Sequence, residues 1–121
     1  MNDIQRHPCN AILSDAVEHG GLVYLAGQVA EDLTQDIRGQ TRQVLAAIDA
    51  LLAKAGSHKS RILSVNIWLA DMRMRDGMNE VWSAWVDPNN LPARATVEAK
   101  LASPHMLVEI ILTAARNPPT A

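Results

Sequence analysis

The segment Ile62-Leu63-Ser64-Val65-Asn66-Ile67-Trp68-Leu69 decides the fold class, because it places a strand between two regions of helical periodicity. Its length and its β-branched residues are typical of a strand. One alternating set is wholly apolar and consists of Leu63, Val65, Ile67 and Leu69. The other set is mixed rather than polar and consists of Ile62, Ser64, Asn66 and Trp68. Such a strand is expected to be covered on both faces.

A helix is predicted on each side of this strand. Before it, apolar residues recur at steps of three and four at Ile37, Thr41, Val44, Leu45, Ile48, Leu51 and Leu52. Asp36 is suited to cap the start of this helix, and Gly56 follows its end. After the strand, a second stripe consists of Met74, Met78, Val81, Trp82 and Trp85. Pro88 and Pro92 end that second helix.

The remaining apolar runs predict four more strands. Residues 10–19 and 22–29 form a hairpin around Gly20-Gly21, a pair that accepts positive φ angles. Residues 94–101 and 106–115 follow the second helix. The order β-β-α-β-α-β-β is an α+β fold with two helices on one sheet face. Because residues 106–115 are also apolar on both parities, we expect the second face to be buried in a homo-oligomer.

Length and composition favour one domain that spans residues 1–121, with residues 117–121 as a flexible tail. Hydrophobic residues make up 48% and charged residues 20% of the chain, which is typical of a globular protein. The net charge of −2 and the scattered Lys and Arg residues make nucleic acid an unfavourable partner.

No apolar run is long enough to span a membrane, and the N-terminus lacks the pattern of a signal peptide. The single Cys9 excludes an internal disulfide and is expected to be a buried thiol. These features favour a cytoplasmic protein. The four His residues show no metal-ligand spacing, so no metal site is expected, and Gly-rich phosphate loops are absent.

Two polar residues, Glu109 and Arg94, break the pattern of their surroundings, and Asn79 is a third candidate. Glu109 is flanked by aliphatic residues, so its carboxylate is either paired at a subunit boundary or functional. Arg94 begins a strand after a Pro-containing loop, where it is either a surface residue or a ligand for a carboxylate. Asn79 lies early in the second helix, where the alternatives are a solvated or capping side chain and a site residue. Trp82 and Trp85 are expected to lie in the core.

Several segments together resemble the RidA (YjgF-type) family over about residues 6–116. They are Leu22-Val23-Tyr24-Leu25-Ala26-Gly27-Gln28-Val29, Gln40-Thr41, Leu52-Ala53-Lys54-Ala55-Gly56, Met78-Asn79-Glu80-Val81-Trp82, Pro92-Ala93-Arg94-Ala95-Thr96-Val97 and Val108-Glu109-Ile110. The resemblance implies a chorismate-mutase-like fold and a homotrimer with ligand clefts between adjacent subunits.

The resemblance also implies an activity. Proteins of this family hydrolyse reactive 2-enamines and 2-imines such as 2-aminoacrylate to a 2-keto acid and ammonia, without a cofactor. Arg94 matches the arginine that binds the substrate carboxylate, and Glu109 matches the acidic residue that helps to place the attacking water. The backbone carbonyl at Thr96 would contact the same water.

Three further positions match residues near the family's cleft, namely Asn79, the backbone of Gly27, and Ser14. Ser14 ends the segment Ala11-Ile12-Leu13-Ser14, where active deaminases carry a Gly-Pro-Tyr-Ser motif, so Leu13 replaces a Tyr that lines the cleft. This departure indicates a divergent subgroup. It leaves open a non-catalytic or regulatory protein that binds small carboxylates, whereas the pI of about 6.0 disfavours the ribonuclease activity attributed to some relatives.

Overall fold

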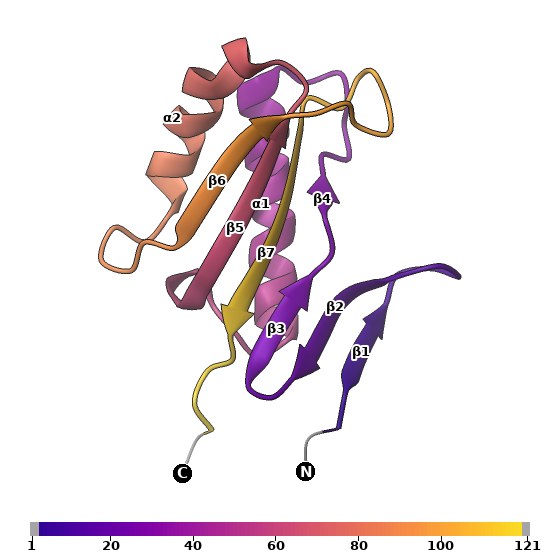
Figure 1. Ribbon diagram of the computed structural model, residues 1–121, viewed down its shortest axis with the longest axis vertical. Helices are drawn as coiled ribbons and strands as arrows, with labels where there is room; N and C mark the ends of the chain where they lie inside the picture. The colour runs from indigo at the N-terminus through magenta and orange to yellow at the C-terminus, as the bar shows by residue number, and fades with distance from the viewer. Residues whose placement is uncertain (1–2, 120–121) are drawn as a thin grey trace.

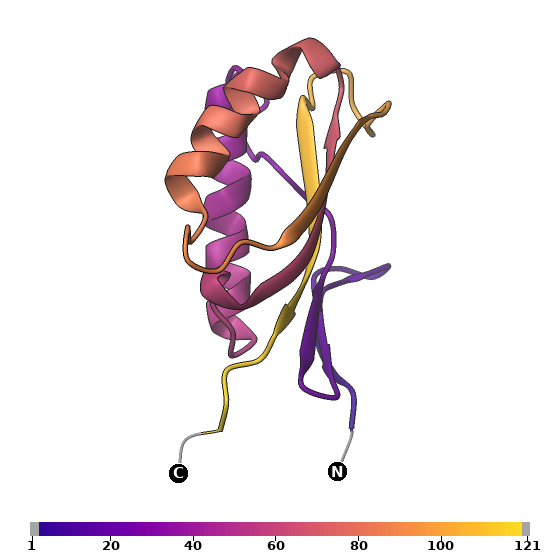
Figure 2. The same ribbon diagram turned by 60° about the vertical axis from the view of Figure 1, so that its left-hand side comes forward.

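The computed structural model describes residues 3–119 as one mixed sheet with both helices on the same face (Figures 1 and 2). The elements in chain order are β1 Gln5–Pro8, β2 Ser14–His19, β3 Leu22–Leu25, β4 Gln28–Val29, α1 Ile37–Lys54, η1 Lys59–Arg61, β5 Ile62–Leu69, η2 Met72–Met74, α2 Arg75–Trp85, β6 Ala93–Glu98 and β7 Val108–Ala115. The α+β class and the placement of both helices are confirmed. None of the helices in the described part of the chain is long and apolar enough to cross a membrane.

The strand order in space is β1-β2-β3-β7-β5-β6, and β4 also pairs with β7. β5 and β6 are parallel because α2 carries the chain back between them, whereas β7 is antiparallel to β3, β4 and β5. β6 therefore ends the sheet, and within the described chain its outer edge has no partner strand.

The core lies between the sheet and the helices, and β5 supplies its centre. Val65, Ile67 and Leu69 are at most 1% exposed. Leu63 was expected in the same set, and that expectation is wrong because it is 48% exposed. The pairing with β7 shifts between Ile62 and Ser64, so one extra residue breaks the alternation there.

The predicted first helix is confirmed with its caps. The Asp36 side chain accepts a hydrogen bond from Gly39 N at 2.9 Å, and Gly56 follows the helix with φ of 78°. Gln40, a polar residue on the core side, is fully buried. Its side-chain amide nitrogen donates to the His105 carbonyl and its oxygen accepts from Leu107 N. These bonds fix the loop that leads into β7.

The predicted Gly20-Gly21 hairpin is confirmed, with φ angles of 61° and 80°. The strand before it begins at Ser14 rather than at residue 10, because the Asn10 side chain accepts hydrogen bonds from Ile12 N and Leu13 N and closes a turn. β1 was not predicted. The 22–29 run is divided into β3 and β4, β6 ends at Glu98, and β7 begins at Val108.

The sheet face opposite the helices is uncovered in the single chain (Figure 2). Tyr24 of β3 is 44% exposed and Val97 of β6 is 49% exposed. Their strand neighbours Val23 and Thr96 point to the helix side, so the side chains of Tyr24 and Val97 belong to the uncovered face.

Cys9 is exposed in the loop between β1 and β2, which corrects the expectation of a buried thiol.

Candidate functional site

Arg94 lies on the helix side of β6. It pairs with Val65 of β5, whose side chain is buried under the helices, and partners in register point to the same face. The Arg94 guanidinium lies over the Trp82 ring of α2, 5.3 Å from the ring centroid. Among residues 3–119, no acidic group lies within ion-pair distance of Arg94. Its hydrogen-bond donors are therefore not used by any carboxylate in the described part of the chain.

The surroundings of Arg94 are aromatic and positive. Partial burial and the charge of Arg75 lower the pKa of Arg94. Trp82 is 6% exposed and its ring centroid lies 5.5 Å from that of Trp85. Trp85 in turn donates its indole N–H to Asp49 of α1 at 2.8 Å. The prediction that Trp82 belongs to the core is confirmed, and Trp82 also supports the arginine.

Thr96 and Asn79 lie near Arg94. Thr96 is two residues further along β6 on the same face, paired with Ile67. Its hydroxyl oxygen is buried, and in the described part of the chain it has no hydrogen-bond partner. Asn79 is half-buried on α2, three residues before Trp82 and therefore on the same side of the helix. Arg94 and Thr96 thus share one face of β6, and Asn79 lies on the side of α2 that carries Trp82.

Glu109 lies on the opposite face of the sheet. It pairs with Trp68 and Val29, whereas the next residue, Ile110, is fully buried under the helices. No ion-pair partner of Glu109 is present within residues 3–119. A Cβ atom at Gly27 would overlap the Glu109 carboxylate, so this carboxylate lies against the Gly27 backbone.

An irregular segment between β3 and β4 creates this contact. Tyr24 pairs with Thr113 of β7, and Gln28 pairs with Ile110 of β7. Between these two pairs, three residues (25–27) therefore face only two residues of β7 (111–112). This is the count of a β-bulge, which turns Gly27 toward Glu109. The Gln28 side chain donates to the Ala26 carbonyl at 3.0 Å and holds the irregular shape.

Ser14 lies beside this bulge. Ala26 N donates to the Asp15 carbonyl at 2.9 Å, which extends the pairing of β2 and β3 toward Gly27. Ser14 precedes Asp15 and is half-buried. Gly27 and Glu109 therefore form a second group of predicted site residues, separate from the group around Arg94, and Ser14 lies at the start of the strand that pairs toward Gly27.

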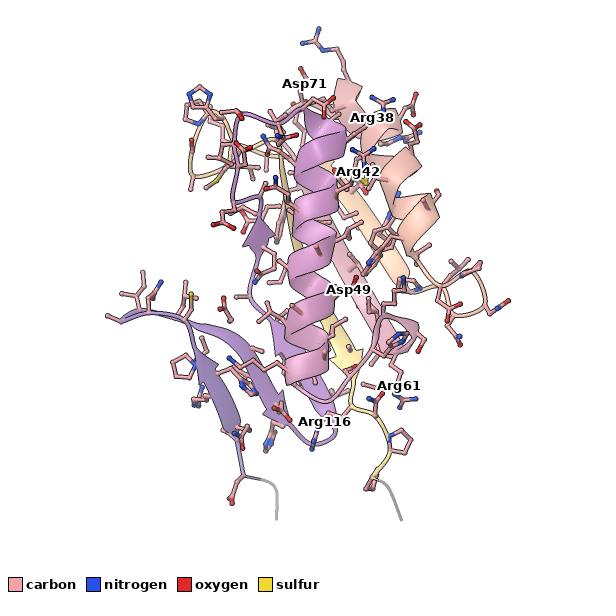
Figure 3. All side chains as sticks on the ribbon, turned by 180° about the vertical axis from the view of Figure 1, so that it is seen from behind. Arg38, Arg42, Asp49, Arg61, Asp71 and Arg116 are labelled. Carbon is pink, nitrogen blue, oxygen red and sulfur yellow. The ribbon has the colours of Figure 1, made fainter. Side chains whose placement is uncertain are left out.

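The two groups lie on opposite faces of one sheet, so a single chain does not bring Arg94 and Glu109 together. A cavity of about 460 Å³ lies between α1 and α2, where Figure 3 shows Arg42 and Asp49. It is lined by neither Arg94 nor Glu109. Within residues 3–119, no three His, Cys, Asp or Glu side chains are placed to hold a metal ion.

Sequence reasoning missed two residues of the Arg94 group. Trp82 was assigned only to the core, and Arg75 was not considered. Both share a side of α2 with Asn79, because the three occur at i, i+4 and i+7. That spacing around Asn79 was the signal that could have identified them.

The chain resembles known proteins over nearly its whole length. The family model described as Endoribonuclease L-PSP matches residues 4–116. A RutC family protein of Haemophilus influenzae is 51% identical over 112 residues, which cover 92% of this chain and 97% of that protein. The RutC family protein YoaB of Escherichia coli is 45% identical, covering 93% of this chain and 97% of that protein. A crystal structure of a YjgF family member from Neisseria meningitidis superposes with a TM-score of 0.94 at 43% identity, covering 97% and 98% of the two chains.

Proposed function

Because the chain belongs to the Endoribonuclease L-PSP family, with RutC and YjgF proteins as its relatives, we propose that it hydrolyses small 2-imines and 2-enamines to 2-keto acids and ammonia. The proposal rests chiefly on the environment of the Arg94 side chain. Its guanidinium is held over Trp82 and has no acidic partner within the described chain. A planar guanidinium binds a carboxylate through two parallel hydrogen bonds, which would fix the orientation of a 2-imino acid.

The proposed reaction adds one water to the carbon of the C=N bond. The water oxygen forms the new C–O bond, and the nitrogen takes up a proton to give a carbinolamine. The C–N bond then breaks, ammonia leaves, and loss of the hydroxyl proton gives the C=O bond of the keto acid. An enamine first becomes the imine by taking up a proton on carbon. A fixed carboxylate and a positioned water lower the barrier mainly through orientation.

Glu109 is the residue that we assign to the water. Its carboxylate lies against Gly27 and no cation among residues 3–119 neutralises it, so it can accept a proton from water. The Thr96 carbonyl would be a second acceptor for this water. Asn79, Ser14 and the Gly27 backbone would line the cleft and bind the substrate.

This assignment requires more than one subunit. Arg94 and Glu109 point to opposite sheet faces, so an active site that uses both must take them from adjacent subunits. The exposed Tyr24 and Val97 on the uncovered face support burial of that face in an oligomer. We therefore place the sites between subunits of a homotrimer, and we expect the protein to act in the cytoplasm without a cofactor.

The direct test generates 2-aminoacrylate with a pyridoxal-phosphate-dependent dehydratase and measures pyruvate release with and without the protein. The protein is expected to accelerate release, and Arg94→Ala is expected to abolish most of the acceleration. Arg42→Ala, an exposed arginine on α1 outside both groups, is the matched control and should behave like the unmodified protein. If the unmodified protein and Arg94→Ala both match buffer, the proposal fails for this substrate.

One observation favours a second function, in which the protein binds carboxylates without catalysis. Leu13, which replaces the Tyr of active deaminases, is 45% exposed beside Ser14 and supplies no hydroxyl group. A pure binder would be stabilised against heat by a 2-keto acid while no imine is turned over. We do not propose ribonuclease activity, since the net charge is −2.

A further inference from the structure

We infer that the substrate of this site carries a second anionic group, bound by Arg75, so that the preferred substrates are four- or five-carbon 2-imino dicarboxylates. The inference rests on the proposed function and extends it from a reaction to a substrate class. It assigns a role to Arg75, the first residue of α2.

The geometry of α2 and β6 supports this assignment. Arg75, Asn79 and Trp82 occupy one side of α2 at i, i+4 and i+7, and a helix rises 1.5 Å per residue, so Arg75 and Trp82 lie roughly 10 Å apart along its axis. At the far end of this stripe, Arg94 lies over Trp82. The two arginines therefore stand at the two ends of one short stripe.

The strand under this stripe runs in the opposite direction. Arg94 lies opposite Trp82, whereas Glu98 at the other end of β6 accepts a hydrogen bond from Met72 N, just before α2 begins. Between these ends lies Thr96, whose buried hydroxyl has no partner in the described chain. Asn79 lies at the middle of the α2 stripe. The interval between the two arginines therefore holds two polar side chains, of which the Thr96 hydroxyl has no partner in the described chain, and such groups suit the imine and carbonyl end of a ligand.

The charges of this region are unbalanced. Among residues 3–119, neither Arg75 nor Arg94 forms an ion pair, and the charge of Arg75 is felt at Arg94, where it lowers the pKa. Glu98 shares the strand face but is engaged by Met72 N, and its charge is felt by Arg73. Two like charges held near each other repel, and a ligand with one anionic group for each of them removes that repulsion.

The chemistry follows from the two fixed cations. Arg94 binds the carboxylate next to the imine carbon, and Arg75 binds the carboxylate at the far end of the side chain. Water addition and ammonia release proceed as described above and yield a 2-oxo dicarboxylate. A monocarboxylic imine leaves Arg75 unpaired and gains less from the site.

The test compares two imines generated in situ by amino-acid oxidases from alanine and from aspartate, with catalase present. Imine that escapes hydrolysis is trapped with semicarbazide, which gives the ratio of kcat/KM for the dicarboxylic and monocarboxylic imines. The unmodified protein should favour the dicarboxylic imine. Arg75→Gln should lower this ratio roughly three- to tenfold, as expected for one lost charge-assisted contact near the surface. Arg75→Lys, which keeps the charge, should retain most of the preference.

Arg73→Gln is the matched control, because Arg73 lies two residues away and is held by Asp71. This variant should leave the ratio unchanged. A preference for the monocarboxylic imine, or a ratio that Arg75→Gln does not alter, would overturn the inference.

If neither imine is hydrolysed, the proposed function fails and calorimetry with oxaloacetate and pyruvate decides the inference separately. Tighter binding of oxaloacetate that depends on Arg75 supports it, and equal binding of the two keto acids overturns it.

Discussion

At the scale of single residues, the contact of Arg94 with the Trp82 ring determines what this arginine can bind. A cation over an indole ring gains about 0.5–1 kcal/mol at an exposed site, through the face of the guanidinium. Its N–H donors point along the edges of the guanidinium plane, and none of them is taken by an acidic group of the described chain. Trp82 thus orders the side chain without using the hydrogen bonds that a carboxylate needs.

Replacement of Gly27 tests the part of the proposed site that contains Glu109. Gly27→Ala introduces a Cβ atom that overlaps the Glu109 carboxylate, so Glu109 must move. We expect a loss of about 1–3 kcal/mol in the free energy of unfolding, measured by urea denaturation, together with loss of imine hydrolysis. The control is Gly27→Ala combined with Glu109→Ala. Because the clash is then removed, the double variant should be more stable than the sum of the single effects, and strict additivity would contradict this contact.

At the scale of elements, the bonds of Gln40 connect α1 to the loop before β7. Gln40→Leu keeps the volume but leaves Leu107 N and the His105 carbonyl without their partner. We expect the unfolding free energy to fall by about 2–4 kcal/mol, since these two part-buried groups and the carbonyls of Leu33 and Gln35 lose their hydrogen bonds to Gln40. Gln43→Leu is the matched control. Its side chain accepts from Asp32 N at the exposed surface, so its loss should cost less than about 1 kcal/mol. Equal costs for both variants would disprove the special role of Gln40.

The turn before α2 provides a prediction about pH. Hydrogen bonds from the Arg73 side chain lower the pKa of Asp71 to about 2, from an ordinary value of 3.8. A depressed carboxyl pKa stabilises the fold above the ordinary value, and this contribution is lost as the pH falls from 3.8 through about 2. NMR titration should find the Asp71 midpoint near 2 and should find it shifted toward 3.8 in Arg73→Gln. A midpoint that does not move in the variant would refute this cause.

The elements that could be predicted are those that local sequence determines. Asp36 at the start of α1 and the Gly20-Gly21 pair act within a few residues, and both were identified correctly. β1 escaped prediction because its four residues are largely exposed and carry no apolar period. The extra residue at Leu63 and the division of β3 from β4 depend on pairing with β7, which is distant in sequence.

For the candidate site, the identity of the residues could be predicted from the sequence, but their placement on the sheet could not. Arg94 and Glu109 were recognisable because each interrupts an apolar pattern and matches a family motif. Their placement on opposite faces was not predictable, because it depends on the register of β5 with β6 and with β7. Arg75 was overlooked because an exposed arginine at a helix start is common and only the contact between α2 and β6 makes it relevant.

At the scale of the whole molecule, one sheet face is covered by helices and the other is not (Figure 2). Val97 lies on the uncovered face and is 49% exposed, so Val97→Asp would place a charge in an oligomer interface. We expect this variant to be monomeric by size-exclusion chromatography with light scattering, and we expect the unmodified protein to be trimeric. Ala50→Asp, at an exposed position on α1, is the control and should remain trimeric. A trimeric Val97→Asp would show that this face is not the interface.

The central claim is that Arg94 of one subunit works with Glu109 of its neighbour. The most direct measurement mixes Arg94→Ala with Glu109→Gln in equal amounts, refolds them together from urea, and records imine hydrolysis. Each variant alone should be nearly inactive. In random trimers, one site in about four combines an intact Arg94 with an intact Glu109, so about a quarter of the unmodified activity should return. A mixture as inactive as its two components would contradict a site shared between subunits.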